Sequence, residues 1–162
     1  MSKSRSNQFK GAMGERIAQG TNPGELKEHL LSWANDVLKR MPKDVSNKKR
    51  NRFNTACVVF DEASGKLYFG RNGGIDKFRD KRHPKLDRIL PPKSLTRYTT
   101  TWNCAESDAI NRALWAGVRL RDMRIYVVEV RINKMGVEKI SCKKCTYAYK
   151  RRIKKNFTGW SK

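Results

Sequence analysis

Three of the four cysteines of this chain fall into two short clusters, and no other feature of the sequence constrains the fold as strongly. The clusters are Cys104-Ala-Glu106 and Cys142-Lys-Lys-Cys145, and each opens a predicted helix. Unpaired N–H groups and the helix dipole at a helix N-terminus lower the pKa of a thiol and favour the thiolate, which is the form that binds metal ions. The chain is therefore expected to fold so that two helix starts meet over one metal ion.

The ligand set predicts which metal ion is held and what it does there. Three protein ligands, Cys104, Cys142 and Cys145, leave the fourth position of a tetrahedral zinc ion free for water, which is typical of catalytic rather than structural zinc. Zinc makes hydroxide available near neutral pH, and Glu106 is close enough to the first ligand to move the proton as general acid and base. Three thiolates also make the site negative, and the two lysines of the second cluster are expected to help to offset that charge.

Two other interpretations of the cysteines are open. A closed Cys₃His zinc site would use His83 as the fourth ligand and would leave Glu106 as an exposed helix residue. A Cys-x-x-Cys pair that opens a helix is also typical of thioredoxin-like redox sites, although the matching cluster at Cys104 disfavours a redox role.

The pattern along the chain predicts one α/β domain. Residues 1–21 are polar and basic without an apolar period, which predicts a flexible basic lead-in, and residues 22–162 form the single domain. The predicted elements are, in order, a helix capped by Asn22 and Pro23 and running to about Met41, a charged connector over 43–52, a hairpin over 54–70, a long loop over 71–101, a helix over 104–116, a strand over 124–132, a short strand near Ile140, and a helix from Cys142 through Tyr149 towards Lys155. This order predicts a mixed β-sheet flanked by helices, with an extra N-terminal helix.

The charge of the chain points to a polyanionic partner. There are 37 Lys and Arg residues against 15 Asp and Glu residues, a formal net charge of +22. Such an excess speeds the capture of nucleic acid, although a charge run can also be only a solvated face. The expected contacts are Arg79, Lys81, Arg82 and Lys85 in the long loop, and Lys143, Lys144, Lys150, Arg151, Arg152, Lys154 and Lys155 in the C-terminal segment, where Tyr147, Tyr149, Phe157 and Trp160 are interleaved for base stacking.

The two clusters together resemble the signature of the cytidine deaminase-like superfamily, H/C-x-E followed by P-C-x-x-C, in which the glutamate is the acid/base and not a zinc ligand. Here the signature reads Cys-Ala-Glu and Ser-Cys-x-x-Cys, with Ser141 in place of the proline. The segment Asn103-Cys-Ala-Glu-Ser-Asp-Ala-Ile-Asn111 is further similar to the bacterial toxin branch of that superfamily. The resemblance covers about residues 54–155 and implies a three-layer sandwich of helices around the sheet.

The resemblance implies a zinc-dependent hydrolytic deaminase that converts cytosine to uracil, and the charge favours DNA, single- or double-stranded, as its substrate. It also implies that Asn72, after the second strand of the hairpin, contacts the sugar or orients the base, unless this residue only forms a turn. Tyr98 and Trp102, with Asn103 beside them, are expected to line the base pocket or hold a neighbouring base, unless these rings only pack in the core. The toxin branch implies a secreted or injected domain that acts in the cytoplasm of a target cell and is neutralised by a cognate immunity protein.

Several alternatives follow from what the signature does not specify. It identifies neither the base nor the polymer, so deamination of RNA, or of a free nucleoside or nucleotide, is one alternative. An alternative of another class is a nucleic-acid-binding module with a structural zinc and no turnover. The sequence has no apolar stretch of about 18 residues and no apolar region typical of a signal peptide, so no membrane partner is expected.

Overall fold

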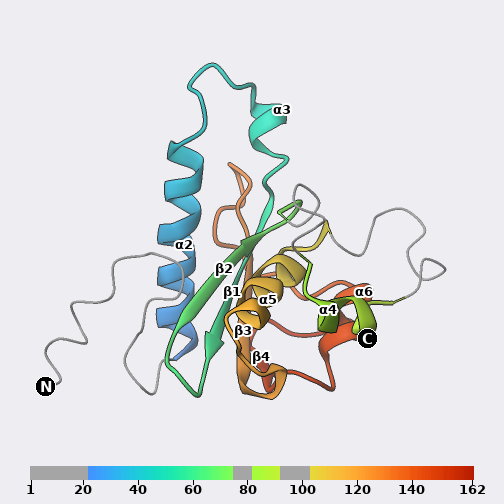
Figure 1. Cartoon of the computed structure of the whole chain (residues 1–162). Coiled ribbons are helices and arrows are strands. Elements are labelled where there is room, and N and C mark those ends of the chain that lie inside the picture. Colours follow the sequence, from blue (N-terminus) through green and yellow to red (C-terminus); the bar gives the residue numbers. More distant parts are fainter. Residues whose placement is uncertain (1–21, 75–81, 92–102) are drawn as a thin grey trace, which may run out of the picture.

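The computed structural model describes residues 22–74, 82–91 and 103–162, and Figure 1 shows its elements with the labels used below. The predicted first helix is confirmed as α2 (Pro23–Lys39). The Asn22 side chain caps it by accepting a hydrogen bond of 2.9 Å from the backbone N–H of Glu25. Its buried residues Leu26, Leu30 and Ala34 lie four residues apart, so one face of the helix packs on the sheet.

The sheet has four strands in the order β2-β1-β3-β4. The predicted hairpin is confirmed as β1 (Thr55–Asp61) and β2 (Leu67–Arg71), which pair antiparallel. The predicted third strand is β3 (Met123–Glu129), which lies antiparallel to β1 on its other side. The short edge strand β4 (Lys155–Asn156) runs parallel to β3, and this parallel pair makes the sheet mixed.

The end of the chain departs from the prediction. The last helix, α6 (Lys143–Tyr149), does not continue towards Lys155, because residues 155–156 are strand β4. The backbone N–H groups of Lys154 and Phe157 donate instead to the carbonyls of Met123 and Ile125 on β3. The expected strand near Ile140 is also absent from the described residues, which show only isolated bridges at Glu138 and Ser141. Pairing with the distant strand β3 makes residues 155–156 a strand, and their charged local sequence does not indicate this pairing.

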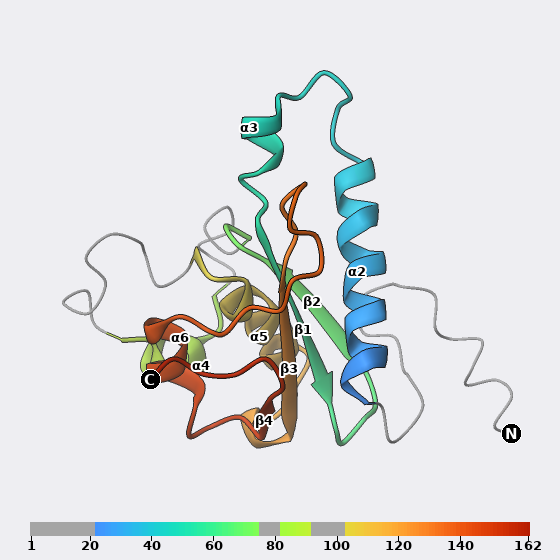
Figure 2. The ribbon, with the colours of Figure 1, turned by 180° about the vertical axis from the view of Figure 1, so that it is seen from behind.

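Side chains of β1 alternate between two cores, one on each face of the sheet. Cys57 and Val59 pack in a core with α5 (Ala105–Trp115) and α6, whereas Val58 and Phe60 pack in a second core with α2. Figures 1 and 2 show α2 alone on one face and α5, α6 and α4 (Pro84–Ile89) on the other. The prediction of an α/β fold with a mixed sheet flanked by helices is confirmed, and the layers are those of a three-layer sandwich.

Helix α5 lies unusually close to β2, and a glycine makes this approach possible. A Cβ atom on Gly70 would lie 2.2 Å from the backbone nitrogen of Ala109 and 2.8 Å from the carbonyl oxygen of Ala105. Gly70 pairs with Cys57 in the sheet. Because Gly70 has no side chain, the backbone of the hairpin can lie directly against the backbone of the helix at this point. The N-terminus of α5 is thereby held against the end of the hairpin.

Two segments predicted as connectors contain short helices. Residues 43–52 include α3 (Asn47–Arg50), capped by Ser46, and the long loop includes α4, capped by His83. A 3₁₀ turn, η5 (Leu120–Asp122), leads into β3. Among the helices of the described residues, none has the length and apolarity needed to cross a membrane.

Candidate metal centre

Three cysteine sulfur atoms converge where the helices α5 and α6 begin. The Sγ atoms of Cys104, Cys142 and Cys145 all lie within 4.8 Å of one another, and those of Cys104 and Cys142 are 3.5 Å apart. Two thiolates that bind one zinc ion with Zn–S bonds of ~2.3 Å and tetrahedral angles lie about 3.8 Å apart. All three thiols are free rather than joined in disulfides. The spacing and the chemistry of these donors therefore fit a metal ion, and the three cysteines can hold one.

Helix geometry explains why these three residues meet. Cys104 is the N-cap of α5 and Cys142 is the N-cap of α6, as the two predicted helix starts require. Cys145 follows Cys142 by three residues, which places both sulfurs on the same side of α6. Cys145 is buried in the core and Cys142 is exposed, so the centre lies at the surface end of the core.

The thiols share negative charge unequally. Hydrogen bonds from the side chains of Cys104 and Cys145, together with the backbone N–H groups of Cys145 and Lys144, lower the pKa of Cys142 to about 2. The pKa of Cys104 is raised, first by its hydrogen bond to Cys142. The pKa of Cys145 is raised by its hydrogen bonds to Cys104 and Cys142 and by burial. The start of α6 therefore stabilises a thiolate at Cys142, as expected for a metal ligand at a helix N-terminus.

Glu106 lines the same pocket as Cys104 and Cys142. Only 4% of its surface is exposed, and burial raises the pKa of its carboxyl group above the ordinary value. The Ser141 hydroxyl donates a hydrogen bond to this carboxylate, which opposes the rise in its pKa, and so does the nearby positive charge of Lys139. A buried carboxyl beside a metal centre, with a pKa moved towards neutrality, is suited to accepting and returning a proton.

The pocket that Glu106 lines has a volume of about 180 Å³. Its walls include Cys104, Cys142 and Lys144 around the metal centre, and Asn72 and Asn103, both predicted to contact the substrate. This volume is below the 300–1,000 Å³ typical of sites for drug-sized ligands. The pocket is therefore suited to a small group such as a single ring.

Asn72 does not point its amide freely into the pocket. Its Oδ1 atom accepts hydrogen bonds of 3.0 and 3.1 Å from the backbone N–H groups of Asn54 and Thr55, and its Nδ2 atom donates to the carbonyl of Arg52 at 2.6 Å. The side chain thus ties the end of β2 to the start of β1. Asn72 thus lies in the wall of the pocket, and its hydrogen bonds give it a role in shaping that wall.

Sequence reasoning missed three polar residues that line the pocket. Lys139 donates a hydrogen bond of 2.9 Å from Nζ to the Thr55 hydroxyl, which in turn donates to Asn54 Oδ1 at 2.8 Å. The position of Lys139, just before the second cysteine cluster, could have indicated this role. Asn54 and Thr55 carried no such signal, because only the sheet brings the start of β1 to the cysteines.

Ser141, which replaces the proline of the superfamily signature, is fully buried behind the site. Its hydroxyl oxygen accepts a hydrogen bond of 2.9 Å from Asn156 Nδ2 while the hydroxyl donates to Glu106. Asn156 Oδ1 accepts from the backbone N–H groups of Thr158 and Gly159. A chain of hydrogen bonds therefore runs from the C-terminal segment through Ser141 to the carboxylate.

His83 lies apart from the cysteines. Its Nδ1 atom accepts a hydrogen bond of 3.1 Å from the backbone N–H of Lys85, and its ring packs edge-on against Trp115 with centroids 4.7 Å apart. Trp115 ends α5, whereas Cys104 precedes its first residue. No histidine or carboxylate joins the three cysteines in the described part of the chain. The arrangement does not support the closed Cys₃His site with His83 as fourth ligand.

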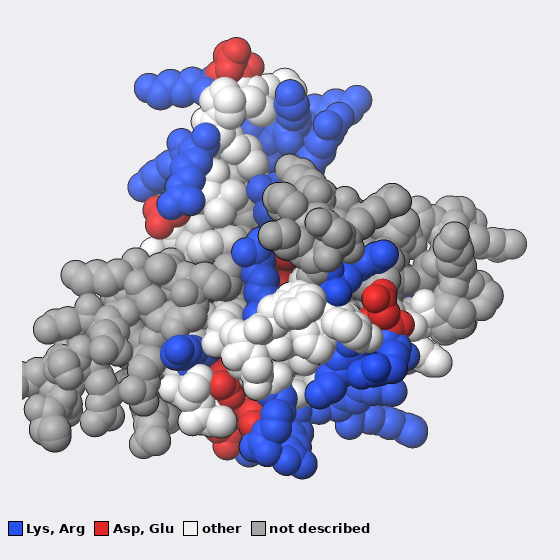
Figure 3. All heavy atoms as spheres, viewed as in Figure 1, with Lys and Arg blue, Asp and Glu red and all other residues white. Residues whose placement is uncertain are grey.

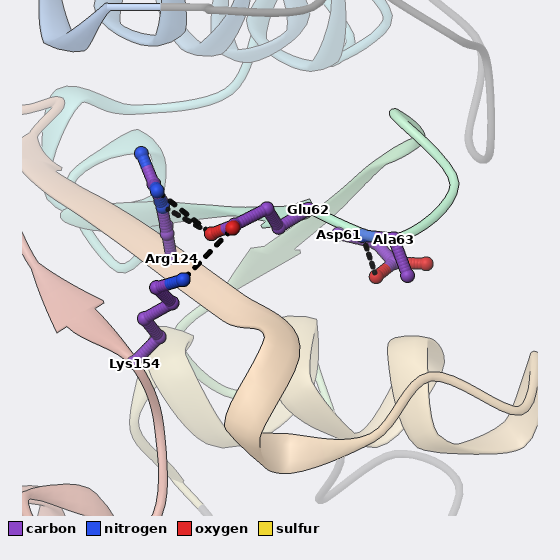
Figure 4. A network of polar contacts seen from close by, with 5 residues as sticks. All are labelled: Asp61, Glu62, Ala63, Arg124 and Lys154. Carbon is purple, nitrogen blue, oxygen red and sulfur yellow. Dashed lines mark hydrogen bonds and ion pairs between the residues drawn. The ribbon is translucent and has the colours of Figure 1, made fainter.

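The C-terminal basic residues are spread over both ends of the sheet. Lys143 and Lys144 lie in the first turn of α6 beside the metal centre, and Lys150, Arg151 and Arg152 follow its last turn. Lys154 and Lys155 lie beside the start of β3, at the end of the sheet opposite the pocket. Figure 4 shows Lys154 and Arg124 converging on Glu62, with nitrogen to oxygen distances of 2.8 and 2.7 Å.

The predicted stacking residues and loop contacts are placed as follows. Tyr149 is fully buried and its hydroxyl lies 2.8 Å from that of Ser107, while Tyr147 is 57% exposed. Phe157 and Trp160 pack against the two cores. Arg82 is half-buried and Lys85 is exposed near α4. Four other predicted residues, Arg79, Lys81, Tyr98 and Trp102, lie outside the described residues.

No protein-family model, curated protein or solved structure shows a significant match to this chain. The site therefore has to be interpreted from its own geometry.

Proposed function

We propose that this chain is a zinc-dependent deaminase that hydrolyses cytosine to uracil in DNA. The observation that carries the proposal is a cluster of three cysteines, two of which, Cys104 and Cys142, line one pocket sized for a single ring together with the buried Glu106 carboxylate. When bound, zinc supplies a Lewis acid that activates water near neutral pH. The donor set fits this ion, since the described cluster offers three sulfur ligands and so leaves one tetrahedral position open.

The residues of the pocket suit each part of the reaction. Cytosine and water give uracil and ammonia, so one proton must move from water to the ring nitrogen and another to the leaving amine. Glu106 serves both transfers, because its carboxyl is buried and has a raised pKa. Asn103 and Lys144 line the pocket, and in this proposal their polar groups contact the edge of the ring. Burial of the carboxylate keeps bulk water away from the transferred protons.

The proposed biological setting is supported by a sequence likeness and by the charge of the chain. The likeness of residues 103–111 to the bacterial toxin branch of the cytidine deaminase-like superfamily supports a toxin domain that acts inside a target cell and is neutralised by an immunity protein. The formal net charge of +22 supports a polynucleotide substrate over a free nucleoside, which needs no such charge.

The test is turnover with a matched variant of the acid/base. Purified, zinc-loaded protein is incubated with single-stranded DNA, the duplex, the same sequence as RNA, and free cytidine, and uracil or uridine is measured. Glu106→Gln keeps the size of the side chain but cannot accept the proton, so we expect full zinc content and a loss of turnover of at least a hundredfold.

The substrate profile separates the alternatives. Conversion of RNA or of free cytidine alone would replace DNA as the substrate. Equal behaviour of the wild type and Glu106→Gln, with no product from any substrate, would contradict an enzyme and support a nucleic-acid-binding module with a structural zinc.

A further inference from the structure

A basic groove adjoins the metal pocket on the side of α2 and α3. It has a volume of about 870 Å³ and shares Asn54, Asn72 and Asn103 with the pocket. The groove is lined by the end of α2, the connection to β1 and the end of β2, and the sequence analysis did not connect the first two of these segments with the site. The pocket and the groove therefore form one continuous depression with a narrow and a wide part.

The charges on this groove all have one sign. Its basic lining residues are Arg40, Lys49, Arg52 and Arg71, and no acidic residue is among the described residues that line it. Residues 39–52 hold seven Lys or Arg residues against the single acid Asp44. Figure 3 shows Lys and Arg side chains gathered over α3 and the neighbouring end of α2, at the top of the view. Such a cluster attracts phosphate groups and is costly to leave without counter-ions.

The groove also has an apolar floor. Val37, Met41 and Val45 line it with half-buried side chains. Arg71 is held in place, because its guanidinium group stacks on the Phe53 ring at 4.4 Å from the centroid. A positively charged groove that follows the backbone is typical of proteins that bind single-stranded nucleic acid. The aliphatic side chains here offer apolar surface to the bases in place of the aromatic rings that such proteins commonly use.

We infer that the groove binds the phosphodiester backbone of a single strand, with the nucleotides next to the target base lying between α2 and α3. The inference rests on the proposed function in one respect, since the target base occupies the adjoining pocket. A base reaches a pocket of about 180 Å³ beside buried Glu106 only after leaving a stack, so the strand is locally unpaired there. The groove is large enough for the neighbouring nucleotides, which the pocket is not.

The test compares two double variants that remove the same charge. Lys49→Gln with Arg52→Gln changes two exposed residues of the groove. Lys66→Gln with Arg121→Gln is the control, because both residues are exposed at the opposite end of the sheet, in the β1–β2 turn and in η5. Binding of fluorescein-labelled single-stranded oligonucleotides, one deoxyribo and one ribo, each with one central cytosine, is measured by anisotropy over a range of salt. All proteins are zinc-loaded and also carry Glu106→Gln, so turnover does not disturb the measurement.

Each phosphate contact contributes a slope of about 0.7 to the dependence of log K on log salt for a single strand. Loss of two contacts should therefore lower the slope of the groove variant by about 1.4, and the control should keep the wild-type slope. Equal loss in both variants, or no loss in the groove variant, would overturn the inference.

The deoxyribo and ribo arms show which polymer the groove prefers. Failure of the proposed function is seen separately, as absence of turnover in protein without the Glu106 substitution.

Discussion

Removal of the Ser141 hydroxyl tests whether the residue that replaces the signature proline positions the acid/base. Ser141 is fully buried, accepts from Asn156 at 2.9 Å and donates to the Glu106 carboxylate. In Ser141→Ala the carboxylate loses one donor, and a hydrogen bond to a charged group is worth about 1.5–3 kcal/mol. Asn156 Nδ2 keeps its second acceptor, the carbonyl of Gly159 at 2.8 Å, so no buried donor is left alone.

The expected result follows from these contacts. Stability should fall by about 1–3 kcal/mol, since one neutral and one charge-assisted hydrogen bond are lost. A supporting residue behind a catalytic group typically costs 10–100-fold in activity when it is removed. We expect kcat for cytosine deamination to fall by this factor, with KM and zinc content close to those of the wild type.

Ser107→Ala is the matched control. Ser107 is also fully buried, follows Glu106 directly, and shares a hydrogen bond of 2.8 Å with the Tyr149 hydroxyl. It should lose comparable stability in denaturant unfolding but keep kcat within a few-fold. If both variants lose kcat equally, or if Ser141→Ala keeps full kcat, then Ser141 acts only as a packing residue and the reasoning is wrong.

Two further perturbations test the metal centre and its support. The purified protein should contain one zinc ion per chain by elemental analysis, and Cys104→Ser and Cys145→Ser should each reduce this content. Compared with protein at a free zinc concentration a thousandfold above Kd, removal of zinc by a chelator should lower the unfolding free energy by about 4 kcal/mol. A melting temperature that does not change on chelation would contradict a site built from these sulfurs. Gly70→Ala should lower the unfolding free energy by about 3 kcal/mol, which is the upper end of the range for overpacked cores. The reason is that the added Cβ would lie 2.2 Å from the backbone nitrogen of Ala109, which cannot move aside as a side chain can. Gly24→Ala is its control, since the nearest atom to that Cβ is the Asn22 side chain at 3.2 Å and the helix start tolerates alanine; equal effects of the two glycine changes in denaturant unfolding would refute the close approach of α5.

Local patterns were sufficient to predict the parts of the fold that depend on local physics. The Asn22 cap, the apolar period of α2 and the turn between β1 and β2 are each properties of a few neighbouring residues, and all three are present. The cysteine clusters were informative for the same reason, because a helix start fixes where Cys104 and Cys142 lie. What these patterns could not show is which segments meet.

The missed features all depend on contacts between distant segments. Strand β4 has the composition of a charged loop and becomes a strand only beside β3. Ser141 looked like a simple departure from a signature until Asn156, fifteen residues later, was found to hold its hydroxyl. Lys154 looked like a nucleic-acid contact, but its partner Glu62 lies 92 positions earlier in the chain. Charge along the sequence therefore did not show that Lys154 pairs with Glu62, nor that basic residues beside α3 line a groove next to the pocket.

Asn72 connects the pocket with the groove, and this connection explains how a fold of this kind can join a reaction site to a binding surface. The Asn72 side chain donates a hydrogen bond to the carbonyl of Arg52 and accepts hydrogen bonds from the backbone N–H groups of Asn54 and Thr55. Arg52 lines only the groove and Thr55 lines only the pocket, while Asn54 lines both. One half-buried amide thus sets the spacing between Arg52 in the groove and Thr55 in the polar wall of the pocket. A strand bound in the groove would consequently meet the pocket at a fixed distance from its phosphates, which is how binding of the polymer could favour one nucleotide for reaction.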